Sequence, residues 1–396
     1  MNFDKYLGNT KKQLTSLCIF MLYISFCIII LNKTFSFTHV NIKLLNHFAT
    51  NICYVACLTK LLLLLKQKKF LYLLFLFCIL LISSIVMKES KSKDIFYIII
   101  LSIAFSFLNF KFAIYSYIFV VGLLLSTIIA YFILEFSTDS SFMFRDGDIR
   151  NTFGFIHPNG LGGITCFLVL SIWAISNSFK LKCLSFLILC LTLCFLCYFV
   201  DCRTAQFILF ITIISFLFYE LLVKYGYVDI FFNCKIVKLL FINFFTILTI
   251  ATFIIAICYD KNNSVHLFFD RLFSGRLELS NNGLSEFRLT PFGYPIQFMD
   301  LDPFGLASVS AVSYQYLDSL YLNVTYNFGV VSVMLLCILH SILVYKCIKI
   351  KNYQLVLVLT LFSVYGLMEN FYIRICFNVF LYLCFSKMLS LKQISK

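Results

Sequence analysis

The sequence predicts an all-α polytopic membrane protein, and three observations support this fold class. Hydrophobic residues make up 61% of the 396 residues and charged residues 13%, a balance that no soluble domain of this size needs. The apolar residues form long runs, many of them close to the roughly 20 residues that cross a bilayer. Most lysines fall in alternate connections between these runs. We expect about 10–12 transmembrane helices in a single integral membrane domain that covers residues 1–396.

The predicted spans follow the apolar runs along the chain. The first run comes after Lys11 and Lys12 and has no small-residue cleavage site, so we expect a retained span and no cleaved signal peptide. The fourth run is short, and a very tight turn joins the last two. The runs lie at residues 14–31, 44–65, 70–87, 95–108, 112–136, 158–179, 181–200, 204–223, 236–258, 320–345, 353–369 and 371–389.

Lysine and arginine are distributed differently between the two sides of the membrane. Placing the N-terminus in the cytoplasm puts most lysines in cytoplasmic connections, so the positive-inside rule predicts that both termini are cytoplasmic. This topology accounts for the net charge of +14 without nucleic acid as a partner. The arginines all fall on the outer side: Arg145, Arg150, Arg203, Arg271, Arg276, Arg288 and Arg374. Guanidinium groups bind phosphate bidentately, which lysine cannot do; the alternative is a network of arginine–carboxylate pairs that holds the outer loops together.

The most informative stretch is 150–160, which reads RNTFGFIHPNG. Helical backbone is disfavoured before a proline, and Pro158 suits the first position of a helix, so a membrane-spanning helix is expected to begin there. The start of a helix presents unpaired N–H groups and the positive end of the helix dipole, which together favour an anion. Arg150, His157 and Asn159 stand beside this point. The pattern suits a phosphate-bearing lipid; the alternative for His157 is a cap on the helix.

One polar segment, 259–317, is expected to be a long extracytoplasmic loop. Within it, apolar residues from Val265 to Phe273 recur at i, i+3, i+4, i+7 and i+8, which predicts an amphipathic helix near 264–275 on the outer leaflet. A loop of this length with its own helix is typical of a lid or a binding surface.

No metal or other cofactor is predicted. The 17 cysteines lie mostly within apolar runs and show no paired CxxC spacing, so they are interpreted as small hydrophobic side chains. Asp300-Leu-Asp302 has the DxD form that some glycosyltransferases use for a divalent cation. A hard cation needs several converging oxygen ligands, and this short pattern alone does not supply them.

Two further polar turns lie on the predicted outer side. Asp201-Cys-Arg203 joins two spans, and there the two charged residues can pair or Arg203 can point toward a ligand. Asp318 precedes the tenth span, either as a helix cap or as a functional carboxylate.

These motifs resemble those of the bacterial polysaccharide repeat-unit polymerases, the O-antigen, capsule and exopolysaccharide polymerases that are related to the O-antigen ligases. The resemblance covers residues ~145–330 by motif and the rest by topology. It implies a type-C glycosyltransferase-like fold and a metal-independent transferase in the bacterial cytoplasmic membrane, with its active site outside the cytoplasm. The motifs are Arg150-x-x-Phe-Gly-Phe-x-His157-Pro-Asn159, Asp201-x-Arg203, Ser274-Gly-Arg276, Pro291-Phe-Gly293 and Asp318-Ser-x-Tyr321…Gly329.

The implied substrates are oligosaccharides linked to a polyprenyl pyrophosphate such as undecaprenyl pyrophosphate. The leaving pyrophosphate gains negative charge as the glycosidic bond breaks, and Arg150, Arg203 and Arg276 are expected to stabilise it together with Asn159. The acceptor hydroxyl needs a base, and His157 is the candidate.

The acidic residues Asp318 and Asp201 complete the expected catalytic set, because either can orient His157 or replace it as the base. A flippase and a chain-length regulator are expected partners of such a polymerase. An O-antigen ligase is the nearest alternative function. A flippase or transporter for the lipid-linked unit is the alternative outside enzymes, but it needs charge along a path through the bilayer midplane, where this sequence has little.

Overall fold

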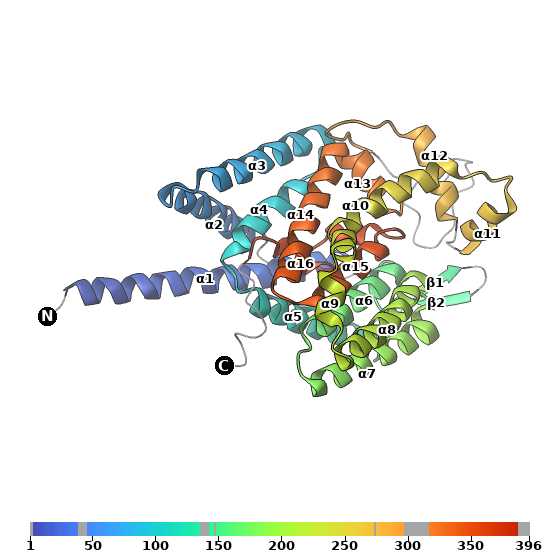
Figure 1. Ribbon diagram of the computed structural model, residues 1–396, viewed down its shortest axis with the longest axis horizontal. Coiled ribbons are helices and arrows are strands. Elements are labelled where there is room, and N and C mark those ends of the chain that lie inside the picture. The colour runs from blue at the N-terminus through green and yellow to red at the C-terminus, as the bar shows by residue number, and fades with distance from the viewer. Residues whose placement is uncertain are drawn as a thin grey trace.

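The computed structural model describes residues 3–38, 46–134, 142–145, 148–272, 275–296 and 317–386, and helices dominate them (Figure 1). Within these ranges nine helices are long and apolar enough to cross a membrane, which confirms a polytopic all-α membrane protein. They are α1 (Phe3–Phe35), α2 (Asn46–Lys66), α3 (Phe70–Ser90), α5 (Phe110–Ile133), α6 (Pro158–Ile175), α7 (Phe179–Phe195) with its π-helical extension η2 (Leu196–Val200), α8 (Arg203–Lys224), α10 (Lys235–Cys258) and α14 (Val330–Lys349).

Shorter elements connect or complete these helices. Two of them, α4 with η1 and α15, are apolar helices below spanning length. The nine-residue α11 falls within the range in which the sequence predicts an amphipathic helix, and α12 follows it after a short break. The shorter elements are α4 (Asp94–Ala104), η1 (Phe105–Phe107), β1 (Phe142–Arg145), β2 (Asp148–Asn151), α9 (Val228–Asn233), α11 (Ser264–Leu272), α12 (Arg276–Glu286), α13 (Leu320–Phe328), α15 (Tyr353–Tyr365), η3 (Asn370–Ile373) and α16 (Val379–Tyr382).

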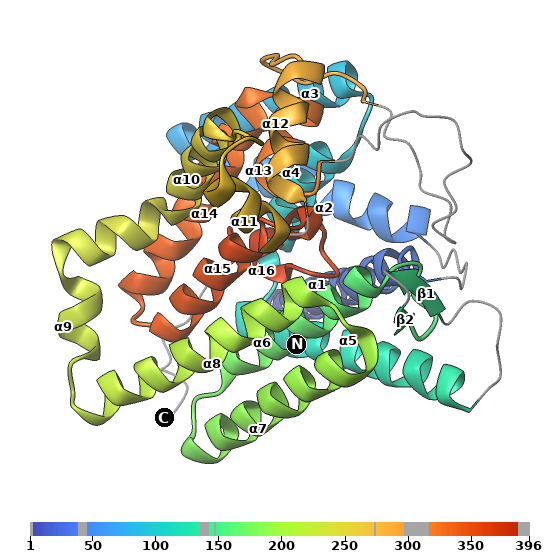
Figure 2. The same ribbon diagram turned by 90° about the vertical axis from the view of Figure 1, so that its right-hand side faces the viewer.

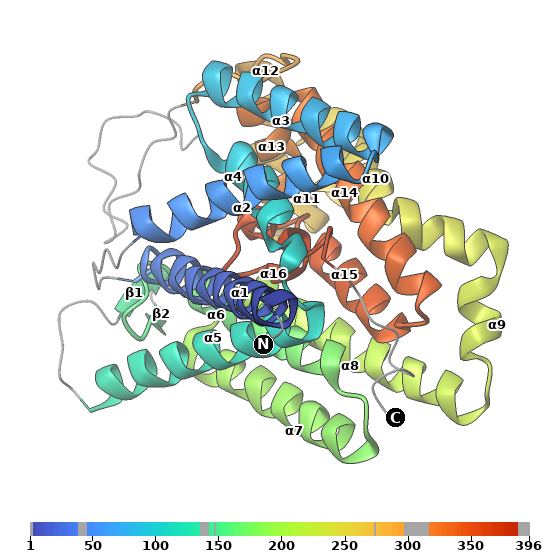
Figure 3. The same cartoon turned by 90° about the vertical axis from the view of Figure 1, so that its left-hand side faces the viewer.

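Helix α6 is the most enclosed of the long helices. In its apolar stretch 78% of the residues are buried, whereas the corresponding share is 22% in each of α2, α3, α8 and α10. It contacts α5, α7, α8 and α15, whereas α2 and α3 lie along the outside of the bundle against α4 (Figure 3). The hairpin of β1 and β2, α11 and α12 all lie at one end of the molecule, which we call the hairpin end (Figures 1 and 2). Because α6 begins beside the hairpin, its enclosed N-terminus faces this end.

The last predicted span, 371–389, is not a spanning helix. After α15 the described chain forms turns, the short 3-10 helix η3 and the four-residue α16. Its apolar side chains are enclosed by other helices, and Tyr372 and Phe377 are fully buried. The Tyr117 hydroxyl of α5 lies 3.0 Å from the carbonyl oxygens of Cys376 and Phe377. The run is apolar because protein surrounds it, and hydrogen bonds from neighbouring helices make an irregular backbone tolerable there.

The tenth predicted span, 320–345, is also divided. Helix α13 ends and α14 begins at Gly329, whose φ of +86° is available mainly to glycine. The Val331 N–H donates a hydrogen bond to the Pro291 carbonyl at 3.0 Å, so a segment of the long loop docks at this break. A Cβ on Gly329 would lie 2.3 Å from the same carbonyl oxygen. The Pro291-Phe-Gly293 motif therefore contacts the break between the two helices.

A two-stranded hairpin precedes α6, and no alternation of residues in the sequence predicts it. Its strands are antiparallel, with Phe142 opposite Asn151 and Arg145 opposite Asp148. The chain leaving the hairpin is held by the end of α1, because the Ile156 N–H donates to the Phe37 carbonyl at 2.9 Å. This double attachment fixes the residues that lead into α6.

We predict that Gly162→Ala lowers the free energy of unfolding by about 1–3 kcal/mol, the usual cost of overpacking. A Cβ at Gly162 would lie 2.5 Å from the Cys202 Sγ at the start of α8. The midpoint of unfolding in detergent measures the effect. Gly122→Ala on α5 is the matched control, since the nearest atom to its Cβ would be Leu168 Cδ2 at 3.9 Å, an ordinary contact. Equal midpoints for the two variants would contradict a tight contact between α6 and α8.

Candidate functional site

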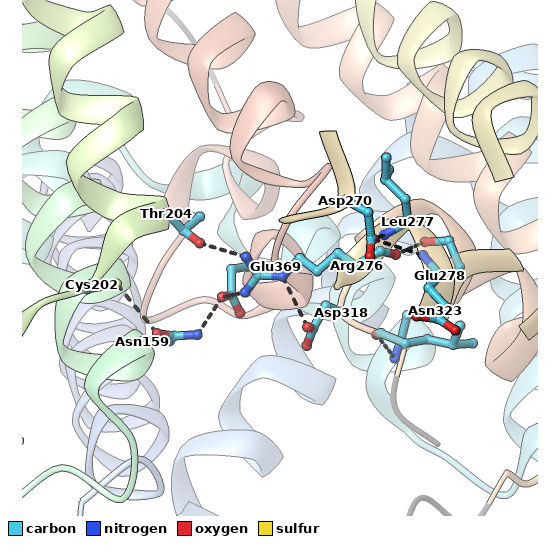
Figure 4. A network of polar contacts seen from close by, with 12 residues as sticks. Asn159, Cys202, Thr204, Asp270, Arg276, Leu277, Glu278, Asp318, Asn323 and Glu369 are labelled. Atoms are coloured by element: carbon cyan, nitrogen blue, oxygen red, sulfur yellow. Dashed lines mark hydrogen bonds and ion pairs between the residues drawn. The ribbon is translucent and has the colours of Figure 1, made fainter. Parts of the chain in front are cut away.

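Polar residues from several elements meet around Arg276 at the hairpin end (Figure 4). The Arg276 Nη2 lies 2.6 Å from Glu369 Oε1, and its Nε lies 3.1 Å from Asp318 Oδ2. Its Nη1 donates to the Thr204 hydroxyl at 3.1 Å. One guanidinium thus joins the start of α12, the first turn of α8, the segment before α13 and the segment after α15.

The start of α12 is capped by a side chain of the preceding helix. The Asp270 Oδ1 accepts hydrogen bonds from the Leu277 N–H at 2.8 Å and the Glu278 N–H at 3.0 Å. Asp270 is itself buried, with a relative exposure of 6%. A carboxylate at the N-terminus of a helix satisfies its unpaired N–H groups and favours the positive end of its dipole. This cap fixes the first turn of α12 and with it the base of the Arg276 side chain.

Glu369 is a buried carboxyl that two side chains contact at the same oxygen. Its Oε1 accepts a hydrogen bond from Asn159 Nδ2 at 2.7 Å in addition to the contact with Arg276. Burial removes water from the charged form and raises the pKa of Glu369 to about 8, although Arg276 and Asn159 act in the opposite direction. Burial also raises the pKa of Asp318, again against the effect of Arg276. The site therefore holds a carboxyl group whose ionisation falls near physiological pH.

Asn159 connects this group to a second buried arginine. Its Oδ1 lies 3.5 Å from Arg150 Nη2 and 3.6 Å from Cys202 Sγ. Arg150, on strand β2, is 5% exposed, and its Nη2 donates to the Asp201 carbonyl at 2.6 Å. The Asp201 carboxylate lies 3.8 Å from Arg150 Nε and is partly exposed, so this ion pair contributes little to stability.

The position of Asp201 depends on a local departure from α-helical geometry. Helix α7 ends in the π-helical turn Leu196–Val200, and Asp201 then adopts a left-handed conformation with φ of +47°. The Asp201 N–H donates to the Leu196 carbonyl at 2.9 Å, which closes the turn. The turn directs the Asp201 carbonyl toward Arg150. Single π-helical turns within helices are frequent at functional sites.

His157 caps α6. Its Nδ1 accepts a hydrogen bond from the Asn159 N–H at 3.1 Å, as in one of the two roles that the sequence left open. A neutral imidazole whose Nδ1 accepts a hydrogen bond carries its own hydrogen on Nε2. To take up a further proton at Nδ1, the ring would have to release the cap.

Most of the predicted site residues come together in space. The network contains Arg150, Asn159, Asp201, Arg276 and Asp318. Arg203 is exposed at the start of α8, and no hydrogen bond or ion pair of its side chain is found within the described ranges. Asp300 and Asp302, the residues of the DxD pattern, lie outside the described residues.

Sequence patterns allow Glu369 to pair with an arginine but do not single out Glu369 or Thr204 as members of the site. Glu369 is the only acidic residue after Asp318 in the sequence, and it lies between two apolar runs. This isolated position is the sequence feature that could have identified it as a site residue. Acidic residues in such a setting are costly and often functional.

Comparison with known proteins found no matching family model, no matching curated protein and no matching solved structure.

Proposed function

We propose that the protein polymerises polyprenyl-pyrophosphate-linked oligosaccharide repeat units into surface polysaccharide. The reaction is a metal-independent glycosyl transfer of the type-C kind, on the outer face of the bacterial cytoplasmic membrane. The observation that carries the proposal is the network of Arg150, Asn159, Glu369 and Arg276, which places two guanidiniums and a carboxyl of raised pKa at one end of a membrane bundle. The motif resemblance supports the same reaction.

The buried Arg150 and the largely buried Arg276 suit a leaving pyrophosphate. Arg150 and Arg276 both contact or approach Asn159 and its partners, so an anion between them meets fixed positive charge in a site shielded from water. An arginine carries more N–H donors than the contacts of Arg276 use, and those that remain are available to phosphate oxygens. Arg203 stands one residue before Thr204, and we keep it as a further ligand for the pyrophosphate.

We assign the base to Glu369. Its carboxylate accepts the proton of the acceptor sugar hydroxyl as that oxygen bonds to the anomeric carbon. The bond from the anomeric carbon to the pyrophosphate oxygen breaks at the same time, and the pyrophosphate leaves with the electron pair. A displacement of this kind inverts the anomeric centre. His157, which was expected to be the base, holds the start of α6 as its cap, and Asp318 orients Arg276.

The length profile of surface polysaccharide tests the proposal in cells that carry variants of the protein. We expect Arg150→Ala to display single repeat units, because removing a donor of this kind slows transfer about 10²–10³-fold. Arg288→Ala is the control, since Arg288 is an exposed arginine of the long polar loop outside the network, and this variant should keep the full chain length. His157→Ala, which removes a cap and leaves the base in place, should retain polymer.

Other outcomes of the same experiment would contradict polymerase activity. Repeat units that accumulate inside Arg150→Ala cells would indicate an exporter of the lipid-linked unit. Long chains that form but stay on the carrier lipid would indicate a ligase. Immunoblotting of the membrane fraction establishes that each variant is present at the wild-type level.

A further inference from the structure

An apolar groove runs along α6 between α5 and α7. It has a volume of about 410 Å³, within the roughly 300–1,000 Å³ range of small-ligand sites. Its walls include Gly122 and Ile129 on α5 and Leu191 and Phe195 on α7, and its floor includes Thr165 and Leu168 on α6. The groove therefore opens the most enclosed of the long helices to the surroundings of the bundle.

Three hydroxyl-bearing side chains, Ser126, Thr165 and Thr192, stand among nine other residues that line the groove, and two of them bond within their own helices. The Ser126 hydroxyl donates to the Gly122 carbonyl at 2.7 Å, and the Thr165 hydroxyl donates to the Leu161 carbonyl at 2.7 Å. Both bonds lie within a single helix, so these hydroxyls offer the groove mainly their carbon atoms. The surface that remains suits a hydrocarbon chain.

The groove ends beneath the segment that links Arg150 to His157. In this segment the Phe153 ring lies 5.6 Å, centroid to centroid, from the ring of Phe195 at the end of α7. The next residue, Gly154, lies so close to Phe132 on α5 that a Cβ there would overlap the ring. The segment thus bridges the ends of α5 and α7 above the groove.

The spacing along α6 matches a lipid with a charged headgroup. Asn159 contacts Arg150 and also Glu369, the partner of Arg276. It lies six residues before Thr165, which lines the near end of the groove, and six residues of helix span about 9 Å. The groove continues to Ile172, about 10 Å further along the same helix. A pyrophosphate at the arginines and its attached chain in the groove would both contact this single helix.

We propose that this groove binds the polyprenyl chain of the lipid-linked substrate, an inference that rests on the proposed function. An ordinary phospholipid acyl chain is the competing occupant. The short distance along α6 between the groove and Asn159 favours the substrate, because that lipid carries the pyrophosphate that the arginines suit.

Steady-state kinetics of the purified full-length protein test the groove with two donors, a repeat unit on undecaprenyl pyrophosphate and the same unit on geranyl pyrophosphate. Gly122→Leu fills the groove. We expect it to raise the ratio of the KM for the undecaprenyl donor to the KM for the geranyl donor about tenfold. This is the effect of losing the burial of about two methylene groups. Leu123→Phe is the matched control, since Leu123 is the next residue of α5, is 58% exposed and does not line the groove. An unchanged ratio in Gly122→Leu would overturn the proposal.

Photo-crosslinking of the wild-type protein provides a readout that requires neither turnover nor a variant. Undecaprenyl pyrophosphate with a diazirine in its chain should label peptides of α5, α6 and α7, and excess undecaprenyl pyrophosphate should suppress the labelling. If the probe labels α5, α6 and α7 of a protein that shows no polymerase activity, the groove is supported and the proposed function is contradicted. Labelling elsewhere by an active polymerase would reject the groove alone. Equal suppression by phosphatidylglycerol would assign the groove to bulk lipid and overturn the proposal.

Discussion

Replacing Glu369 by glutamine should slow polymerisation about 10²–10⁴-fold, the range over which a general base contributes to a rate. Glutamine keeps the size of the side chain and can still accept the hydrogen bonds of Arg276 and Asn159, but it cannot take up a proton at neutral pH. The reduction should fall mainly on kcat. Initial rates of chain extension by purified protein measure it, with Glu286→Gln, an exposed glutamate on α12, as the control.

The pH dependence gives the same prediction a second readout. Only the carboxylate form of Glu369 is a base, so the wild-type rate should rise with pH and level off above an apparent pKa of about 8. Stability should change in the opposite direction, because the folded protein holds this proton more tightly than the unfolded chain, whose glutamate pKa is about 4.3. The wild type should lose stability as pH rises from about 4.3 through about 8, and Glu369→Gln should not show this loss. A glutamine variant with the wild-type rate and pH profile would exclude Glu369 as the base.

Arg276→Ala should lower the free energy of unfolding by about 3–5 kcal/mol, because it removes the charged partner of two largely buried carboxyl groups. Polymerisation should be lost as well. Arg276→Lys should also fail in polymerisation, since a single ammonium cannot contact Thr204, Asp318 and Glu369 with the geometry of a planar guanidinium. The unfolding midpoint in detergent and the rate of chain extension are the two measurements.

Two further variants separate the charge effect from general damage to the fold. Arg288→Ala removes an exposed arginine that lies over the Tyr294 ring, and its effect on stability should stay within about 0.5 kcal/mol. The double variant Arg276→Ala/Glu369→Gln should recover part of the stability that Arg276→Ala loses, because it no longer buries an ionisable carboxyl group that has lost its charged partner. If the double variant were less stable than Arg276→Ala, Arg276 would not act mainly as a counter-ion to Glu369.

The fold was predictable where the physics is local. Long apolar runs and the positions of charges located the spanning helices, and Pro158 identified the start of α6 to the residue. Hydropathy failed for 371–389 because it reports that a segment avoids water and does not distinguish lipid from the protein interior. The division at Gly329 depends on the docking of Pro291, a contact between distant segments that no local pattern reveals.

The sequence indicated several residues of the site but not which of them contact one another. The arginine-containing motifs indicated Arg150 and Arg276 as residues of one site, and the helix start indicated Asn159. Glu369 was missed because its partners Asn159 and Arg276 lie 210 and 93 residues away in the sequence. His157 caps α6 for a local reason, since its ring nitrogen accepts a hydrogen bond from the backbone of the helix that it precedes.

The late position of Glu369 in the chain has a consequence for how the protein is made. During synthesis Arg150 and α6 emerge first, then Arg276, and the carboxyl that joins them follows only after α15. A chain arrested before that point carries the arginines without the group assigned to accept the proton. Chains fold progressively from the N-terminus as they emerge. Partly inserted chains would therefore be unable to transfer sugars, and activity would begin when the last polar turn reaches its place between α6 and α12.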